Sequence, residues 1–108
     1  MDVKSFDDNG VAIFQVSGEI NISTSPELRR LFEKQGAKRV VVDLEKVSYI
    51  DSSGLATLVE MLKKTKSQNG SLGLAGMSDK VKSLFEITKL DKLFAIYPNR
   101  SQAVTQAK

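Results

Sequence analysis

The sequence of 108 residues contains neither cysteine nor histidine. Their absence excludes disulfide bonds, the usual zinc sites and every nucleophilic mechanism that needs a cysteine or a histidine base. The remaining carboxylates, lysines and hydroxyl groups show no recognisable catalytic spacing, and the glycine-rich phosphate loop of nucleotide enzymes is missing. We therefore predict a protein that is not an enzyme and that needs no cofactor and no metal ion.

Long hydrophobic runs are missing too. No apolar stretch approaches the roughly 18 residues of a membrane-spanning helix, and the opening residues, Met1–Lys4, do not look like a secretory signal. We expect a cytoplasmic protein without membrane insertion. Because the length is close to the usual size of one domain, residues 1–108 are predicted to form a single domain.

Tryptophan is absent, and aromatic residues make up only 6% of the chain. The formal net charge is +3, but the basic residues are spread along the sequence and do not form a patch interleaved with aromatic residues. Proteins that bind nucleic acid usually carry such a patch. We therefore expect no nucleic-acid partner.

The hydrophobic pattern begins with two extended runs, residues 3–6 and 11–16, joined by an Asn-Gly turn at residues 9–10. Asn-Gly favours a type I′ hairpin turn, so the first two strands are expected to be antiparallel. A helix start follows at residues 23–27, where serine and threonine precede a proline, and this helix is expected to end by Gly36.

Strands and helices alternate in the rest of the chain. Residues 39–44 form a β-branched run apolar enough for a central strand buried on both faces, and an amphipathic helix with the spacing i, i+3, i+4 and i+7 begins near Leu55. The remaining predicted elements are a strand at 72–75, a helix from Ser78, a strand at 94–97 and a short helix through Val104. This order predicts an α/β fold with one mixed, mostly parallel sheet of about five strands and about four helices. The phenylalanines fall on apolar faces and are expected in the core: Phe6, Phe14, Phe32, Phe85 and Phe94.

Partners and ligands of open α/β sheets collect at the carboxyl ends of the parallel strands. Three loops are expected there, at residues 18–25, 47–53 and 76–79, and the middle loop leads into the run Asp51-Ser52-Ser53-Gly54. One aspartate or serine suffices to cap a helix and contributes about 1 kcal/mol. A glycine inside the first turn costs roughly 0.5 to 1 kcal/mol relative to alanine. The spacing alone therefore leaves both a cap and a functional site open.

Several segments resemble the STAS family, which anti-sigma factor antagonists and sulfate transporters share. The family signature is matched by the strand at 40–44 followed by residues 47–55, which contain Asp-Ser-Ser-Gly-Leu. The segment Gly-Glu-Ile-Asn at 18–21 resembles the family's Gly-Glu-Leu-Asp, and residues 81–94 resemble its late helix and last strand. The similarity covers nearly the whole chain.

The resemblance implies a function. In free-standing bacterial members, the serine directly after the aspartate is phosphorylated by an anti-sigma factor that is itself a serine kinase. Here that residue is Ser52. The unphosphorylated form binds the anti-sigma factor and frees the sigma factor, the phosphorylated form dissociates, and a serine phosphatase resets the cycle. The partner-binding surface implied by the resemblance contains Gly18, Glu19, Asn21, Tyr49, Asp51, Ser52, Ser53 and Gly54.

Two points stay open in the sequence. Asn21 stands where the family usually has an aspartate, which removes a negative charge beside the expected phosphorylation site. Ser53 is expected to be the internal cap of the helix, which leaves Ser52 for phosphorylation. An alternative function shares every motif: an accessory subunit of a transporter or of a larger signalling assembly.

Overall fold

The computed structural model describes residues 1–107. One five-stranded sheet and four α-helices form a single α/β domain, as predicted, with a short 3-10 helix before the last strand. In chain order the elements are β1 (Asp2–Asp8), β2 (Val11–Ile20), α1 (Ser25–Gln35), β3 (Arg39–Ile50), α2 (Ser52–Ser67), β4 (Ser71–Ala75), α3 (Asp79–Ile87), the 3-10 helix η1 (Leu90–Lys92), β5 (Ala95–Tyr97) and α4 (Arg100–Ala107). In this described part of the chain, no helix has both the length and the apolar composition needed to cross a membrane.

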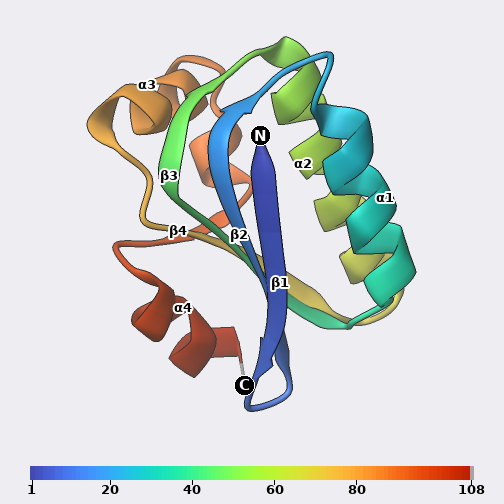
Figure 1. Cartoon of the computed structure of the whole chain (residues 1–108). Coiled ribbons are helices and arrows are strands. Elements are labelled where there is room, and N and C mark those ends of the chain that lie inside the picture. The colour runs from blue at the N-terminus through green and yellow to red at the C-terminus, as the bar shows by residue number, and fades with distance from the viewer. Residues whose placement is uncertain (108) are drawn as a thin grey trace.

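The strands lie in the order of the sequence, β1-β2-β3-β4-β5 (Figure 1). The β1–β2 pair is antiparallel, and the three pairs from β2 to β5 are parallel, which confirms the predicted mixed sheet. The turn between β1 and β2 has positive φ at both Asn9 (54°) and Gly10 (85°), as a type I′ turn requires. β3 is the central strand, and its residues 40–44 are all buried, as their apolar run predicts.

Each face of the sheet has its own core. Helices α1, α2 and α3 contribute Leu28, Leu58 and Phe85 to the larger cluster, together with alternate residues of β2, β3 and β4. The smaller cluster lies on the opposite face, where α4 contributes Ala103 and Val104. In Figure 1, α1 and α2 lie side by side along one side of the sheet, and α4 lies on the other.

The prediction that all five phenylalanines are core residues is wrong for Phe6. Four of them are buried, but the side chain of Phe6 is 41% exposed. Phe6 lies on β1, an edge strand that pairs only with β2 among residues 1–107, and the guanidinium carbon of Arg100 is 5.2 Å from the centre of its ring. The apolar spacing placed Phe6 on a face of the sheet, but α4 covers that face chiefly over β3, β4 and β5.

The predicted loop at residues 47–53 is also corrected. β3 continues to Ile50, so Val47–Ile50 are strand residues, and helix α2 starts at once with Ser52. The alternation of buried Val47 and Ile50 with exposed Ser48 and Tyr49 is that of a strand end with a local irregularity. The register of β2 against β3 shifts twice in this region, between Gln15 and Ser17 and between Gly18 and Glu19. Such shifts re-aim side chains where a sheet ends.

Candidate functional site

The candidate site lies where β2 and β3 end side by side, at the upper end of the sheet in Figure 1. Parallel pairing places Glu19 beside Tyr49 and Ile20 beside Ile50. The chain then leaves β2 into the loop before α1, and leaves β3 directly into α2. Residues 18–21 and 49–54, which are far apart in the sequence, therefore meet at one edge, as the sequence predicts.

Asp51 holds the two segments together. Its backbone N–H donates to the carbonyl oxygen of Ile20 at 3.1 Å. One carboxylate oxygen, Oδ1, accepts from the N–H of Gly54 at 2.9 Å and so caps α2, and the other, Oδ2, accepts from the N–H of Ile22 at 3.1 Å. The single side chain thus fixes both the start of α2 and the loop after β2.

The expectation that Ser53 is the cap of this helix is wrong, because Asp51 is the N-cap residue and accepts the capping hydrogen bond. Asp51 has the extended backbone (φ −91°, ψ −177°) of an N-cap, whereas Ser53 already lies inside the first turn. Sequence alone could not separate the two, since aspartate and serine are about equally good caps and the choice depends on where the helix begins within one residue.

Ser52 is the first residue of α2, and its side chain is exposed. Within residues 1–107 its hydroxyl takes part in no hydrogen bond. The first N–H groups of a helix have no partner inside the helix. Asp51 satisfies the one on Gly54, and those of Ser52 and Ser53 have no hydrogen-bond acceptor among residues 1–107. The site therefore presents a free hydroxyl and two free N–H donors at the positive end of the α2 dipole.

Gly54 is required by close packing. A Cβ atom at this position would lie 2.5 Å from the carbonyl oxygen of Ile20 and 2.7 Å from Cγ2 of Ile50. Real Cβ atoms do not approach other atoms so closely, so any side chain would push α2 away from the ends of β2 and β3. Capping of α2 does not require a glycine in the first turn. The close contact between the start of the helix and the sheet explains why Gly54 is there.

Asn21 has a structural role in the other loop. Its Oδ1 accepts from the N–H groups of Ser23 (2.9 Å) and Thr24 (3.1 Å), and its Nδ2 donates to a carboxylate oxygen of Glu19 at 3.4 Å. The side-chain oxygen thus supports the turn that leads into α1. Glu19 is exposed beside it, while Gly18 adopts φ 94° and packs near Met1.

Two large apolar side chains are exposed around this site. Tyr49 is 39% exposed, and the Lys80 ammonium is 5.6 Å from the centre of its ring. Ile22 is 73% exposed, although its backbone is held by Asp51. Tyr49 was expected in the surface from the sequence, but Ile22 was missed. Its signal is a large apolar residue between the end of a strand and a helix start, where polar residues are usual.

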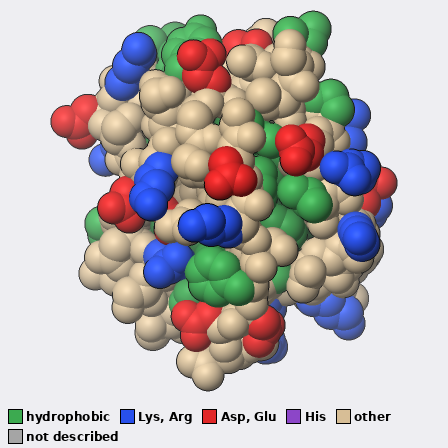
Figure 2. All heavy atoms as spheres, in the orientation of Figure 1, with side chains coloured by type: hydrophobic (Ala, Val, Ile, Leu, Met, Phe, Trp, Pro, Cys, Tyr) green, Lys and Arg blue, Asp and Glu red, His purple; other side chains and the backbone are tan. Residues whose placement is uncertain are grey.

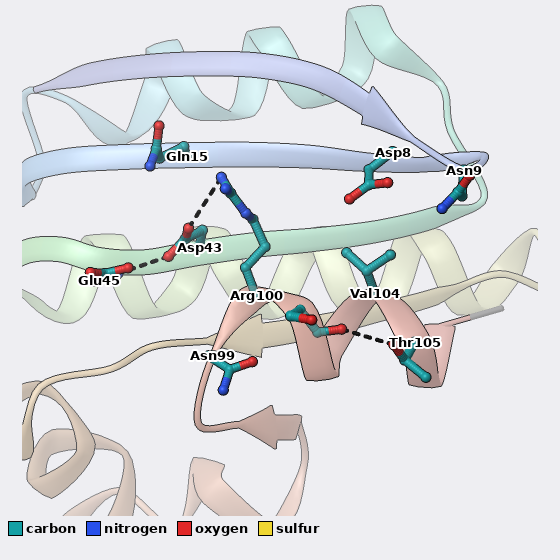
Figure 3. Close-up of a pocket in the computed structure, with 10 residues that line it drawn as sticks. Asp8, Asn9, Gln15, Asp43, Glu45, Asn99, Arg100, Val104 and Thr105 are labelled. Carbon is teal, nitrogen blue, oxygen red and sulfur yellow. Dashed lines mark hydrogen bonds and ion pairs between the residues drawn. The ribbon is translucent and has the colours of Figure 1, made fainter.

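A second polar region lies beside α4 and does not share these residues (Figure 3). Here the side chain of Arg100 reaches the buried carboxylate of Asp43, with Nη1 3.7 Å from Oδ2, next to a hollow of about 460 Å³. The other oxygen of Asp43 accepts from the N–H of Glu45 at 3.1 Å. One oxygen of the carboxylate thus connects α4 to β3, and the other is held within β3. No group of acidic side chains suited to a metal ion occurs in the part of the chain that the structure describes.

The comparisons with known proteins identify the family of this fold. The family model for the STAS domain matches residues 5–103, so the chain belongs to the STAS domain family. Among curated relatives, the anti-sigma-B factor antagonist of Staphylococcus aureus is 38% identical over 85 residues, which cover 76% of this chain and 79% of the relative. The anti-sigma-B factor antagonist of Listeria monocytogenes is 36% identical over 99 residues, or 89% of this chain and 86% of that protein.

Among solved structures, a putative anti-sigma factor antagonist from Thermotoga maritima superimposes with a TM-score of 0.91. Its sequence is 26% identical, and the alignment covers 97% of this chain and 93% of that one. The predicted family membership and fold class are therefore confirmed.

Proposed function

We propose that this chain is an anti-sigma factor antagonist that works in the cytoplasm and is switched by phosphorylation of Ser52. In its unphosphorylated form it binds an anti-sigma factor, which is also a serine kinase, and thereby releases the sigma factor. Phosphorylation of Ser52 ends the binding, and a serine phosphatase restores it. The chain acts by binding and has no catalytic activity of its own.

The observation that carries the proposal is the state of Ser52. Its hydroxyl is exposed and free of internal hydrogen bonds at the first position of α2, while its neighbour Asp51 is fully engaged. A phosphoryl group can therefore be added without breaking an internal contact of the side chain. The helix dipole and the open N–H groups of Ser52 and Ser53 favour the added negative charge.

The same geometry supports an effect of phosphorylation on partner binding rather than on the fold. A phosphoserine carries about −1.5 to −2 charges and three strong acceptor oxygens, which hold water. A partner that packs against Ser52, Tyr49 and Ile22 would have to remove that water or accept the charge next to the carboxylates of Glu19 and Asp51. A loss of about 3 kcal/mol in binding corresponds to a more than 100-fold change in affinity.

The experiment starts with affinity capture of the Ser52→Ala protein from a lysate of the source cells and identification of the retained proteins by mass spectrometry. A kinase of the anti-sigma type is expected. Calorimetry then compares the wild type, Ser52→Ala, Ser52→Asp and the phosphorylated protein against that kinase. We expect tight binding of the first two, weaker binding of Ser52→Asp and weakest binding of the phosphorylated protein.

Ser53→Ala is the matched control, because it removes the neighbouring hydroxyl without touching the cap. Intact-mass analysis after incubation with the kinase and ATP is expected to show one phosphate on the wild type and on Ser53→Ala and none on Ser52→Ala. The proposal is wrong if the wild type is phosphorylated on Ser53, or if the phosphorylated protein binds as tightly as the unmodified one. Capture of transporter subunits instead of a kinase would support the accessory role.

A further inference from the structure

The outer edge of β1 is a second surface, separate from the site at Ser52. β1 forms one edge of the sheet and pairs with β2 along its full length, from Asp2 opposite Ser17 to Asp8 opposite Val11. Its other edge faces solvent among the described residues, and Figure 2 shows hydrophobic, basic and acidic side chains lying close together on the face where β1 runs. An open strand edge is a template for another strand.

The pattern of side chains on β1 is specific. Lys4, Phe6 and Asp8 are at alternate positions and so lie on one face, the face on which Arg100 covers the Phe6 ring at 5.2 Å. All three are exposed. The strand therefore carries a positive charge, an aromatic ring and a negative charge in a row, with the ring in the middle.

We propose that β1 pairs with β1 of a second copy of this chain, antiparallel and centred on Phe6, to form a continuous ten-stranded sheet across a twofold axis. A twofold axis perpendicular to the sheet keeps each face of the sheet on its own side. Each residue of one β1 therefore lies opposite a residue of the other β1 whose side chain is on the same face. The twofold axis passes between one residue and the same residue of the second copy, and we call that residue the centre of the pairing.

Charge and the length of the overlap together select the register. A centre at Lys4 places Lys4 against Lys4, a centre at Ser5 places Asp2 against Asp8, and a centre at Asp7 places Asp7 against Asp7. Each of these three centres puts like charges directly opposite one another, which is unfavourable. A centre at Val3 avoids like charges, but it pairs only residues 2–4 of each β1, whereas a centre at Phe6 pairs residues 4–8. The centre at Phe6 places Lys4 opposite the second copy's Asp8 twice and stacks the two Phe6 rings between these pairs.

The backbone agrees with this arrangement. In the type I′ hairpin, Asp8 and Val11 form the hydrogen-bonded pair next to the turn, so the N–H and C=O groups of Lys4, Phe6 and Asp8 face β2. Those of Ser5 and Asp7 point outward. With the centre at Phe6, Ser5 of one copy lies opposite Asp7 of the other, so the outward groups meet. The Phe6 pair then takes the closer, non-hydrogen-bonded spacing, which favours contact between side chains.

The dimer leaves the site at Ser52 open in each copy. Phe6 lies opposite Ile13 of β2, five residues before Gly18, where the site begins. Two short strands bury less than the roughly 1,200 Å² of a stable interface, so we expect a weak dimer with a dissociation constant of about 10 µM to 1 mM. Phosphorylation of Ser52 is expected to leave that constant unchanged.

The first test is sedimentation velocity over a range of concentrations up to the millimolar region. Lys4→Asp and Asp8→Lys are each expected to weaken the dimer at least tenfold, and the double variant Lys4→Asp/Asp8→Lys to restore it. Lys66→Asp is the control, because it makes the same charge change on an exposed residue at the end of α2. Circular dichroism checks that every variant is folded.

The second test uses the absence of cysteine in the natural chain. Phe6→Cys places one thiol on the axis at the spacing of a non-hydrogen-bonded pair, which suits a disulfide. Under mild oxidation this variant is expected to form a covalent dimer at least tenfold faster than Ser5→Cys. A wild type that stays monomeric up to the millimolar region, a double variant without recovery, or faster cross-linking of Ser5→Cys would each overturn the proposal.

Discussion

The carboxylate of Asp51 accepts the backbone N–H of Ile22 at 3.1 Å while it caps α2 through Gly54. Ile22 is thereby held at the surface beside Ser52, although its side chain is 73% exposed and buries little area of its own. The loop after β2 and the start of α2 form one unit because the Asp51 carboxylate accepts a backbone hydrogen bond from each of them.

Replacement of Asp51 tests this unit. Asp51→Asn keeps one acceptor oxygen, so either Gly54 or Ile22 loses its partner, and we expect the free energy of unfolding to fall by about 1 to 2 kcal/mol. Affinity for the partner is expected to fall as well, because the Ile22 loop is released. Thermal denaturation and calorimetric binding measure the two effects. Ser53→Ala is the control and is expected to keep the stability within about 0.5 kcal/mol.

Gly54→Ala tests the close contact with the sheet. Alanine is better than glycine in a helix by about 1 kcal/mol, but its Cβ would meet the Ile20 carbonyl at 2.5 Å. We expect the contact to dominate and the stability to fall by about 1 to 3 kcal/mol. Gly36→Ala is the comparison, since Gly36 has φ 62° and no neighbouring atom within 4 Å of the point where its Cβ would lie, so this variant measures the cost of a positive φ without a steric contact. A Gly54→Ala protein more stable than the wild type in urea unfolding would contradict the steric explanation.

Ile22→Ser tests the exposed apolar contact. Because the side chain touches little of its own protein, we expect a change in stability of no more than about 0.5 kcal/mol. Loss of a buried apolar contact in the complex is expected to weaken partner binding about tenfold, as measured by calorimetry. Ile87→Ser is matched to it, because Ile87 is 77% exposed at the end of α3. Equal losses in both variants would show that Ile22 has no special role.

Asn21→Asp introduces the negative charge that the sequence resemblance leads us to expect at this position. The new carboxylate can still accept from Ser23 and Thr24, but it loses the hydrogen bond to Glu19 and faces that residue with a like charge. We expect nearly unchanged stability and a change of several-fold in the rate of Ser52 phosphorylation, larger at low salt than at high salt. Asn99→Asp at the start of α4 is the control. Rates that match the wild type at both salt concentrations would exclude an electrostatic effect of this position.

Asp43→Asn tests the contact between α4 and the sheet. The Asp43 side chain is only 3% exposed, but Arg100 is 40% exposed, so the pair is partly screened by water. We expect a loss of about 1 to 2 kcal/mol in urea unfolding, with partner binding intact. Lys64→Ala, which removes the exposed pair between Lys64 and Glu33, serves for comparison and is expected to change the stability by less than about 0.5 kcal/mol. Equal losses of stability in the two variants would mean that the contact between Asp43 and Arg100 contributes no more than an exposed ion pair.

Features encoded over a few neighbouring residues were predictable from the sequence. The Asn9-Gly10 turn fixes its own conformation, and the leucines of α2 define a face without knowledge of the fold. The expected meeting of residues 18–21 with 49–54 also followed, because parallel strands place their carboxyl ends at one edge.

Features that depend on tertiary contacts were not predictable. Whether Phe6 is covered depends on where the short helix α4 lies. The end of β3 at Ile50 depends on pairing with β2, which overrides the polar residue Ser48. The bond from Ile22 to Asp51 spans 29 residues, and no local pattern signals it. The partner of Asp43 is farther still, on the last helix.

The position of Ser52 inside α2 sets a condition on any enzyme that modifies it. Many kinases bind their substrates as extended, flexible peptides, but here the acceptor hydroxyl belongs to the first turn of a helix fixed by Asp51 and packed through Gly54. An enzyme that modifies Ser52 in the folded protein must therefore recognise a folded surface and fit its active site around the end of a helix, whereas an enzyme that requires an extended peptide could act only after the start of α2 has opened.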